Sequence, residues 1–115
     1  MGIAKIKSKQ FAIRIVNAHR YLRDEKHEYI LSKQLLRSGT SIGANLAEAE
    51  CAFSRKEFLA KTFIALKETS ETKYWLELLV ETDYLTKEQF ESLYSDAEEL
   101  SKMLTATTKT MRRGD

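Results

Sequence analysis

The chain has 115 residues and a formal net charge of only +2, with 43% hydrophobic and 31% charged residues. These values are typical of one compact domain, and they exclude nucleic-acid attraction through net charge alone. No run of about 18 apolar residues is present, which excludes a membrane-spanning helix. The single cysteine, Cys51, has no second thiol to pair with, and the N-terminus lacks the apolar core of a signal peptide. We therefore expect a cytoplasmic protein of one domain, residues 1–115.

The pattern of helix breakers predicts long helices, because proline is absent and only four glycines occur. The charged cluster "RDEKHE" interrupts the apolar pattern early in the chain, and the polar bend "ETDY" interrupts it later. "SRKE" and "TKEQ" are helix-start signals, in which Ser54 and Thr86 cap helices that carry Glu57 and Gln89 at the third position. We predict an all-α, up-down-up-down four-helix bundle, with helices near 4–24, 27–52, 54–82 and 86–112.

The predicted helix 27–52 contains two glycines, yet its apolar register continues through them. One sector of about 60° on an uninterrupted helix holds Leu31, Leu35, Ile42, Leu46, Ala49 and Phe53. Because each interior glycine costs roughly 1 kcal/mol relative to alanine, we expect a compensating contact. Gly39, Gly43 and Ala47 form a stripe of small residues, which predicts close packing of a neighbouring helix.

A polar stripe runs along another side of the same helix and is the one line on it that suggests a site. It consists of Gln34, Arg37, Ser41, Asn45 and Glu48. A hydrogen-bonded seam between helices or subunits is the favoured interpretation, since unpaired buried polar groups are costly. Contact with a ligand or RNA through Arg37 is the alternative. A phosphate-binding loop is disfavoured, because "SGTSIGAN" lacks the Walker spacing and its lysine.

The predicted helix 54–82 is apolar on every side, whereas the helix 86–112 has a single apolar stripe. One bundle has only one interior, so the surplus apolar face predicts a contact with another subunit, with Phe63 and Trp75 as candidates. Base stacking by Tyr74 and Trp75 is the less favoured alternative.

Catalytic and metal-binding patterns are not recognisable. Neither His19 nor His27 has a glutamate three positions before it, as a di-iron bundle would require, and no nucleophile elbow is present. Cys51 has no neighbour that would predictably lower its pKa, so we interpret it as an inert thiol. We expect no enzyme, metal or cofactor.

Basic residues concentrate near the two chain ends, which an up-down-up-down bundle brings to one side. The candidates for nucleic-acid contact are Lys5, Lys7, Lys9, Lys109, Arg112 and Arg113. The opposite side would hold Asp24, Glu25, Glu28, Glu77, Glu81, Asp83 and Glu88. A solvated terminus without a ligand is an equally weighted interpretation of the basic cluster.

Two segments, "QLLRSGTSIGANLAEA" and "FIALKETSETKYWLELL", resemble the four-helix-bundle proteins encoded in intervening sequences of bacterial 23S ribosomal RNA genes. The resemblance extends from the first helix to "ETDYL" and is strongest at Gln34, Arg37, Ser41, Ile42, Asn45, Ala47 and Glu48. This chain has Ala49 and Gly43 where members often have glycine and proline, which suggests a subfamily.

The resemblance implies a bundle that assembles into a ring, with a homopentamer as the implied assembly, and no established catalytic activity. The accessory proteins of diversity-generating retroelements look like the same bundle and work with a reverse transcriptase and nucleic acid. Our leading hypothesis is therefore a homo-oligomeric RNA-binding or ribonucleoprotein accessory module. The alternative is a structural ring that binds protein partners and no nucleic acid.

Overall fold

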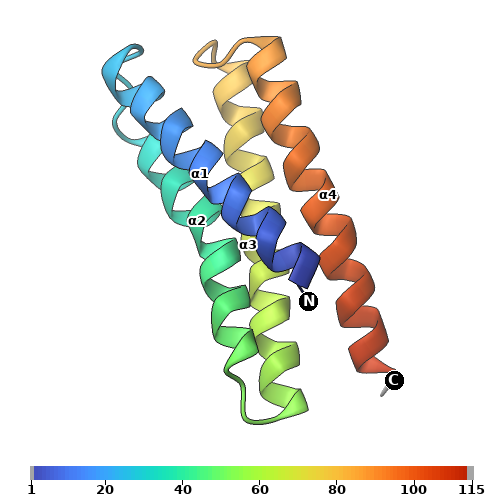
Figure 1. The fold of residues 1–115 in the computed structure, drawn as a ribbon. Coiled ribbons are helices and arrows are strands. Elements are labelled where there is room, and N and C mark those ends of the chain that lie inside the picture. The colour runs from blue at the N-terminus through green and yellow to red at the C-terminus, as the bar shows by residue number, and fades with distance from the viewer. Residues whose placement is uncertain (1, 114–115) are drawn as a thin grey trace.

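The computed structural model describes residues 2–113 and shows an antiparallel bundle of four helices (Figure 1). The helices are α1 (Gly2–Asp24), α2 (Leu31–Glu50), α3 (Arg55–Glu81) and α4 (Lys87–Arg112). Together they form an elongated body of 46 × 21 × 19 Å. The predicted all-α bundle is confirmed, and the described part of the chain contains no strand.

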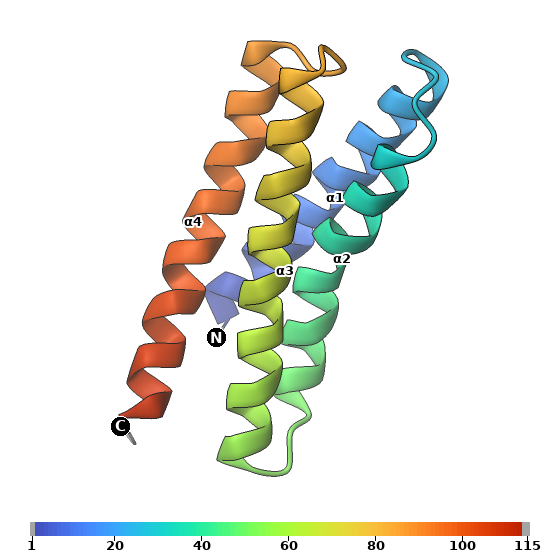
Figure 2. The ribbon, with the colours of Figure 1, turned by 180° about the vertical axis from the view of Figure 1, so that it is seen from behind.

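Consecutive helices are neighbours in space, and α1 makes a smaller contact with α4 that closes the bundle. The helices α1 and α3 therefore lie on one diagonal, and α2 and α4 on the other. Figure 1 shows α1 in front of α3, and Figure 2, seen from behind, shows α3 in front of α1. The centre of the bundle is filled by side chains from all four helices, among them Phe11, Ile15, Leu35, Ile42, Leu46, Leu76, Leu79, Leu100 and Leu104.

The start of α2 corrects the prediction, because the helix begins at Leu31 and not near residue 27. His27 has a left-handed φ of 55°, which turns the chain. The Glu28 carboxylate then accepts hydrogen bonds from the backbone N–H groups of Ile30, Leu31 and Ser32, at 3.3, 3.1 and 2.7 Å. Glu28, predicted to belong to the exposed acidic end, is thus a helix cap that is only 8% exposed.

The other two predicted helix starts agree with the structure within one residue. Thr86 and Gln89 form a full capping box, since Thr86 Oγ1 accepts from the Gln89 backbone N–H at 3.1 Å and Gln89 Oε1 accepts from the Thr86 N–H at 2.9 Å. Ser54 Oγ accepts from the Glu57 N–H at 3.0 Å. The Glu57 carboxylate reaches back one residue further than predicted, to the N–H of Phe53 at 3.3 Å.

The end of α2 also differs from the prediction, which placed Phe53 in the buried sector of this helix. The helix ends at Glu50, and Phe53 lies in the loop to α3 with 99% of its surface exposed. The cap at Ser54 starts the next helix at once, so residues 51–53 have to turn and leave the register of α2.

No helix among the described residues has the length and apolar character needed to cross a membrane.

Candidate nucleic-acid interface

The two glycines of α2 face α1 and bring the two helices close together. A Cβ atom added at Gly39 would lie 2.8 Å from both Cγ atoms of Ile15, which is fully buried. A Cβ at Gly43 would lie 3.3 Å from Ser8 Oγ. Ala47, further along the stripe, is exposed and lines a shallow groove beside Lys5. The small residues thus fix the position of α1, which carries three of the predicted basic contacts.

The polar stripe of α2 faces α3 and forms ion pairs within the chain. The Arg37 guanidinium binds Glu68 at 3.4 Å and also binds Glu71, whose carboxylate accepts from Trp75 Nε1 at 2.9 Å. Glu48 binds Lys61 at 2.8 Å, and this hydrogen bond raises the pKa of the lysine. An RNA contact through Arg37 would have to displace two carboxylates.

The remaining members of the polar stripe stay close to their own helix. Ser41 Oγ donates to the Arg37 carbonyl at 2.5 Å, and Asn45 Nδ2 donates to the Ser41 carbonyl at 2.8 Å. Gln34 is exposed. Within the stripe, Arg37 and Glu48 therefore pair with α3, whereas Ser41 and Asn45 bond within α2.

The two candidate interface aromatics of α3 differ in exposure. Trp75 is partly buried against the core, whereas Phe63 is exposed together with Ile64 and Tyr74. A second exposed apolar face lies on α1, at Ile3, Ile6 and Ile13. The bundle therefore has unburied apolar side chains on two diagonal helices.

The six basic residues expected at one end do not form one cluster. Lys5 pairs with Glu50 of α2, and Lys7 pairs with Glu99 of α4 at 2.7 Å. Because α1 crosses the bundle obliquely (Figure 1), Lys7 meets α4 at its middle, at Glu99. Glu99 precedes Lys109 by about ten residues, or roughly 15 Å along the helix axis. Lys9 is exposed on α1 and lines the groove between α1 and α2. Lys5 and Lys7 are thus paired with carboxylates, and the expected single cluster of six unpaired basic residues is not present; nucleic-acid contact itself stays a prediction.

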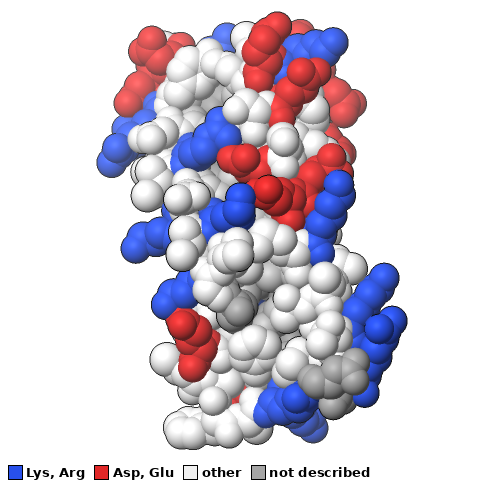
Figure 3. Space-filling view, turned by 45° about the vertical axis from the view of Figure 1, so that its right-hand side comes forward, with Lys and Arg blue, Asp and Glu red and all other residues white. Residues whose placement is uncertain are grey.

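A smaller basic surface remains where α4 ends. The first half of α4 carries acidic residues, Glu88, Glu91, Asp96, Glu98 and Glu99, and its last turns carry basic ones. Figure 3 shows carboxylates over the upper half of the molecule and basic side chains along the lower end of α4. Lys56, in the first turn of α3, lines the same hollow as Arg112. We call this surface the basic end; it consists of Lys56, Lys102, Lys109, Arg112 and Arg113.

All five side chains of the basic end are exposed, and none of them forms an ion pair within residues 2–113. Lys56 and Lys102 were not predicted as contacts. The sequence of α4, with acidic residues in its first half and basic residues in its second, could have indicated Lys102 as a member of this surface. Lys56 joins the surface only through the packing of α3 on α4.

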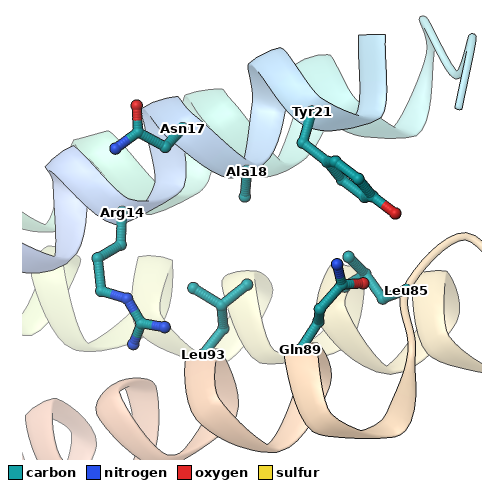
Figure 4. Close-up of a pocket in the computed structure, with 7 residues that line it drawn as sticks. All are labelled: Arg14, Asn17, Ala18, Tyr21, Leu85, Gln89 and Leu93. Carbon is teal, nitrogen blue, oxygen red and sulfur yellow. The ribbon is translucent and has the colours of Figure 1, made fainter. Parts of the chain in front are cut away.

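A cleft between α1 and α4 is a further concave feature, and no sequence pattern predicted it. Arg14 ties the two helices together, binding Asp96 at 2.5 Å and Ser92 Oγ at 2.6 Å. Beyond this contact the helices diverge and leave a cavity of about 280 Å³ (Figure 4). It is lined by Arg14, Asn17, Ala18, Tyr21, Leu85, Gln89 and Leu93.

The two histidines considered above for metal or catalytic chemistry contact neighbouring polar groups. His19 Nδ1 lies 3.2 Å from the Ser32 carbonyl, and His27 Nδ1 lies 3.2 Å from the Tyr29 hydroxyl in the same turn. Tyr94 donates to Glu77 at 2.7 Å, and this hydrogen bond raises the pKa of the tyrosine to about 12. Cys51 is exposed. Among the described residues, no group of three or more His, Cys, Asp or Glu side chains could hold a metal ion.

Comparison with known proteins identifies the family. None of the curated proteins is similar to the chain. A crystal structure of a protein with unknown function from the S23 ribosomal protein family of Bacteroides thetaiotaomicron is 55% identical in sequence. It superposes with a TM-score of 0.91 over 92% of this chain and 98% of the other. The family model described as 23S rRNA-intervening sequence protein matches residues 3–106. The chain belongs to the 23S rRNA-intervening sequence protein family.

Proposed function

We propose that this protein is a non-enzymatic, homo-oligomeric bundle that binds RNA, on its own or as an accessory of a ribonucleoprotein. The observation that carries the proposal is the basic end, whose five side chains are exposed and without a carboxylate partner among the described residues. Such side chains are free to neutralise phosphates. The family, named for intervening sequences of 23S rRNA, supports a role close to RNA.

Assembly into a ring is proposed from the two apolar faces. The faces of α1 and α3 lie on one diagonal of the bundle, so they point in opposite directions. A two-fold dimer would pair one face with itself and leave the other in water. A heterologous contact, in which the α1 face of one copy meets the α3 face of the next, covers both faces and closes into a ring when the rotation allows. We propose five copies.

Assembly of several copies into a ring would raise the affinity of the basic end for RNA. A cyclic assembly repeats each subunit in the same orientation, so all the basic ends lie on one side of it. One copy offers only a few phosphate contacts, whereas linked copies bind a single RNA with a high effective concentration. Affinity should therefore depend on assembly and should fall steeply with salt.

Assembly is tested by sedimentation equilibrium at micromolar concentration. We expect a mass of five times 13.3 kDa for the wild type. Ile13→Asp on α1 and Phe63→Asp on α3 should each lower this mass, because either charge would be buried at a ring contact. A wild-type monomer throughout this concentration range contradicts the ring.

RNA binding is tested by measuring the affinity at several salt concentrations. If duplex RNA behaves as B-DNA does, each lost phosphate contact should reduce the slope of log K against log salt by about 0.9. We expect a flatter slope for a variant with glutamine at Lys102, Lys109, Arg112 and Arg113. The matched control places glutamine at Arg20, Lys26, Lys33 and Lys67, four exposed residues outside the basic end, and should keep the wild-type slope. A ring that binds no RNA at low salt would favour the alternative, a scaffold for protein partners.

A further inference from the structure

Phe53 is the most exposed large apolar side chain described, with 99% of its surface open to solvent. Its side chain buries almost no apolar surface in the fold, although the apolar pattern of the sequence predicted a buried position. Both faces of its ring are therefore available to a ligand. The other exposed large apolar residues lie on helices or, like Tyr29 and Ile30, in the α1–α2 turn, and all of them are less open than Phe53.

The loop that carries Phe53 is held by hydrogen bonds on both sides. The N–H groups of Cys51 and Ala52 bind the carbonyls of Glu48 and Ala49 at 3.0 and 3.1 Å. The N–H of Phe53 itself binds the Glu57 carboxylate at 3.3 Å. The backbone is thus fixed before any ligand arrives, which lowers the entropy lost when the ring is covered.

Basic side chains lie at the same end of the bundle as Phe53. Lys56 follows three residues later in the first turn of α3, and it shares a hollow with Arg112, which brings the last turn of α4 to the same end. The nearby carboxylates are engaged, since Glu50 pairs with Lys5 and Glu57 binds the Phe53 N–H. An exposed aromatic ring beside unpaired cations matches the stacking and charge that single-stranded nucleic acid requires.

We propose that the α2–α3 loop is a binding site for single-stranded RNA, in which Phe53 stacks on an unpaired base while Lys56 and Arg112 contact the flanking phosphates. This inference rests on the proposed RNA-binding function and names the class of RNA. Bases in a duplex are already stacked and paired, so a phenylalanine ring has no open base to cover there. Phe63 lines the hollow that Lys56 and Arg112 share, but the proposed base stacking uses Phe53 and not Phe63.

The test compares binding of labelled single-stranded RNA of about 12 nucleotides with binding of a duplex of the same length. Fluorescence anisotropy is measured on the assembled protein. Phe53→Leu keeps the apolar bulk and removes the ring, and it should weaken single-strand binding by roughly 5- to 150-fold, the range for one lost stacking contact. The salt slope should stay at its wild-type value, because stacking releases no counterions. Phe53→Tyr should restore the affinity.

Tyr29→Leu is the matched control, because Tyr29 is an exposed aromatic in the α1–α2 turn at the other end of the bundle, and its affinity should equal that of the wild type. Equal binding by Phe53→Leu and wild type, or a wild-type preference for the duplex, overturns this inference while RNA binding stands. A change in oligomer mass of Phe53→Leu also overturns it and makes Phe53 a protein contact. Absence of any RNA binding by the wild type at low salt overturns both proposals.

Discussion

Helix α1 contacts α2 through glycines and contacts α4 through charged and hydroxyl side chains, and the two contacts differ in closeness. At Gly39 the backbone of α2 comes so near that a methyl group would overlap Ile15. At the α4 side one arginine spans the gap, and beyond it the helices separate around a cavity of about 280 Å³. The same helix is thus closely packed on one side and loosely packed on the other.

The difference shows which contact holds α1 in place. The Arg14–Asp96 ion pair is solvent-exposed, with 41% and 43% of the two side chains open, and such pairs contribute about 0–1 kcal/mol. Close packing against Ile15, which is fully buried, brings many atoms into van der Waals contact at once. We infer that α2 fixes the position of α1 and that α4 only orients it.

The largest effect is expected from Gly39→Ala. The new methyl group would clash with Ile15, and overpacking of this kind costs about 1–3 kcal/mol, although alanine gains about 1 kcal/mol in helix propensity. Urea unfolding followed by circular dichroism, at equal protein concentration for all variants, should show a lower free energy of unfolding. A more stable variant would mean that α1 can move away from α2 freely.

The matched control for this change is Gly43→Ala, because its methyl group would lie 3.3 Å from Ser8 Oγ and 3.6 Å from the Ser8 backbone, without the overlap found at Gly39. We expect little change in stability for this variant. The larger side chain of Gly43→Leu would meet the α1 backbone at Ser8 and should lower stability or disrupt assembly despite its better helix propensity.

A smaller effect is expected where α1 contacts α4. Arg14→Met removes the ion pair and the bonds to Ser92, and Asp96→Asn removes the charge on the other side. A double-mutant cycle built from the two should give a coupling energy of about 0.2–1 kcal/mol. A coupling above that range would place the polar contact on a par with the glycine contact and remove the distinction between them.

The smallest effect is expected in the cleft itself. Ala18 lines the cavity together with Leu85 and Leu93, so Ala18→Leu has room for its added atoms (Figure 4). We expect the free energy of unfolding to stay within about 0.5 kcal/mol of the wild type, as for most substitutions outside a packed core. A loss comparable to that of Gly39→Ala in the same urea assay would show that the cleft is closed in solution.

Features that repeat within one helix were predictable from the sequence. The caps at Ser54 and Thr86 depend on residues three positions apart, and the helices that they start were placed within one residue. The packing of Gly39 against α1 followed from the stripe of small residues on a helix whose apolar register continues through the glycines. Local periodicity is sufficient for such features because an α-helix fixes which residues share a face.

Features that depend on how two helices cross were not predictable. The oblique path of α1 takes Lys7 to Glu99, although the order of the helices alone places it near Lys109. Glu28 has the composition of a solvated acidic cluster, and only the turn at His27 brings its carboxylate onto three backbone N–H groups. Crossing angles and turn geometry result from packing of the whole bundle, which no single helical pattern contains.

The order of contacts around the bundle has a consequence for how the chain folds. Each helix packs chiefly on the next one in the sequence, and only the loose contact of α1 with α4 joins distant parts of the chain. Most native contacts therefore close short loops, and folding of such low contact order is fast. The three helical hairpins can form before the two ends meet, so Arg14→Met should speed unfolding and leave the folding rate unchanged.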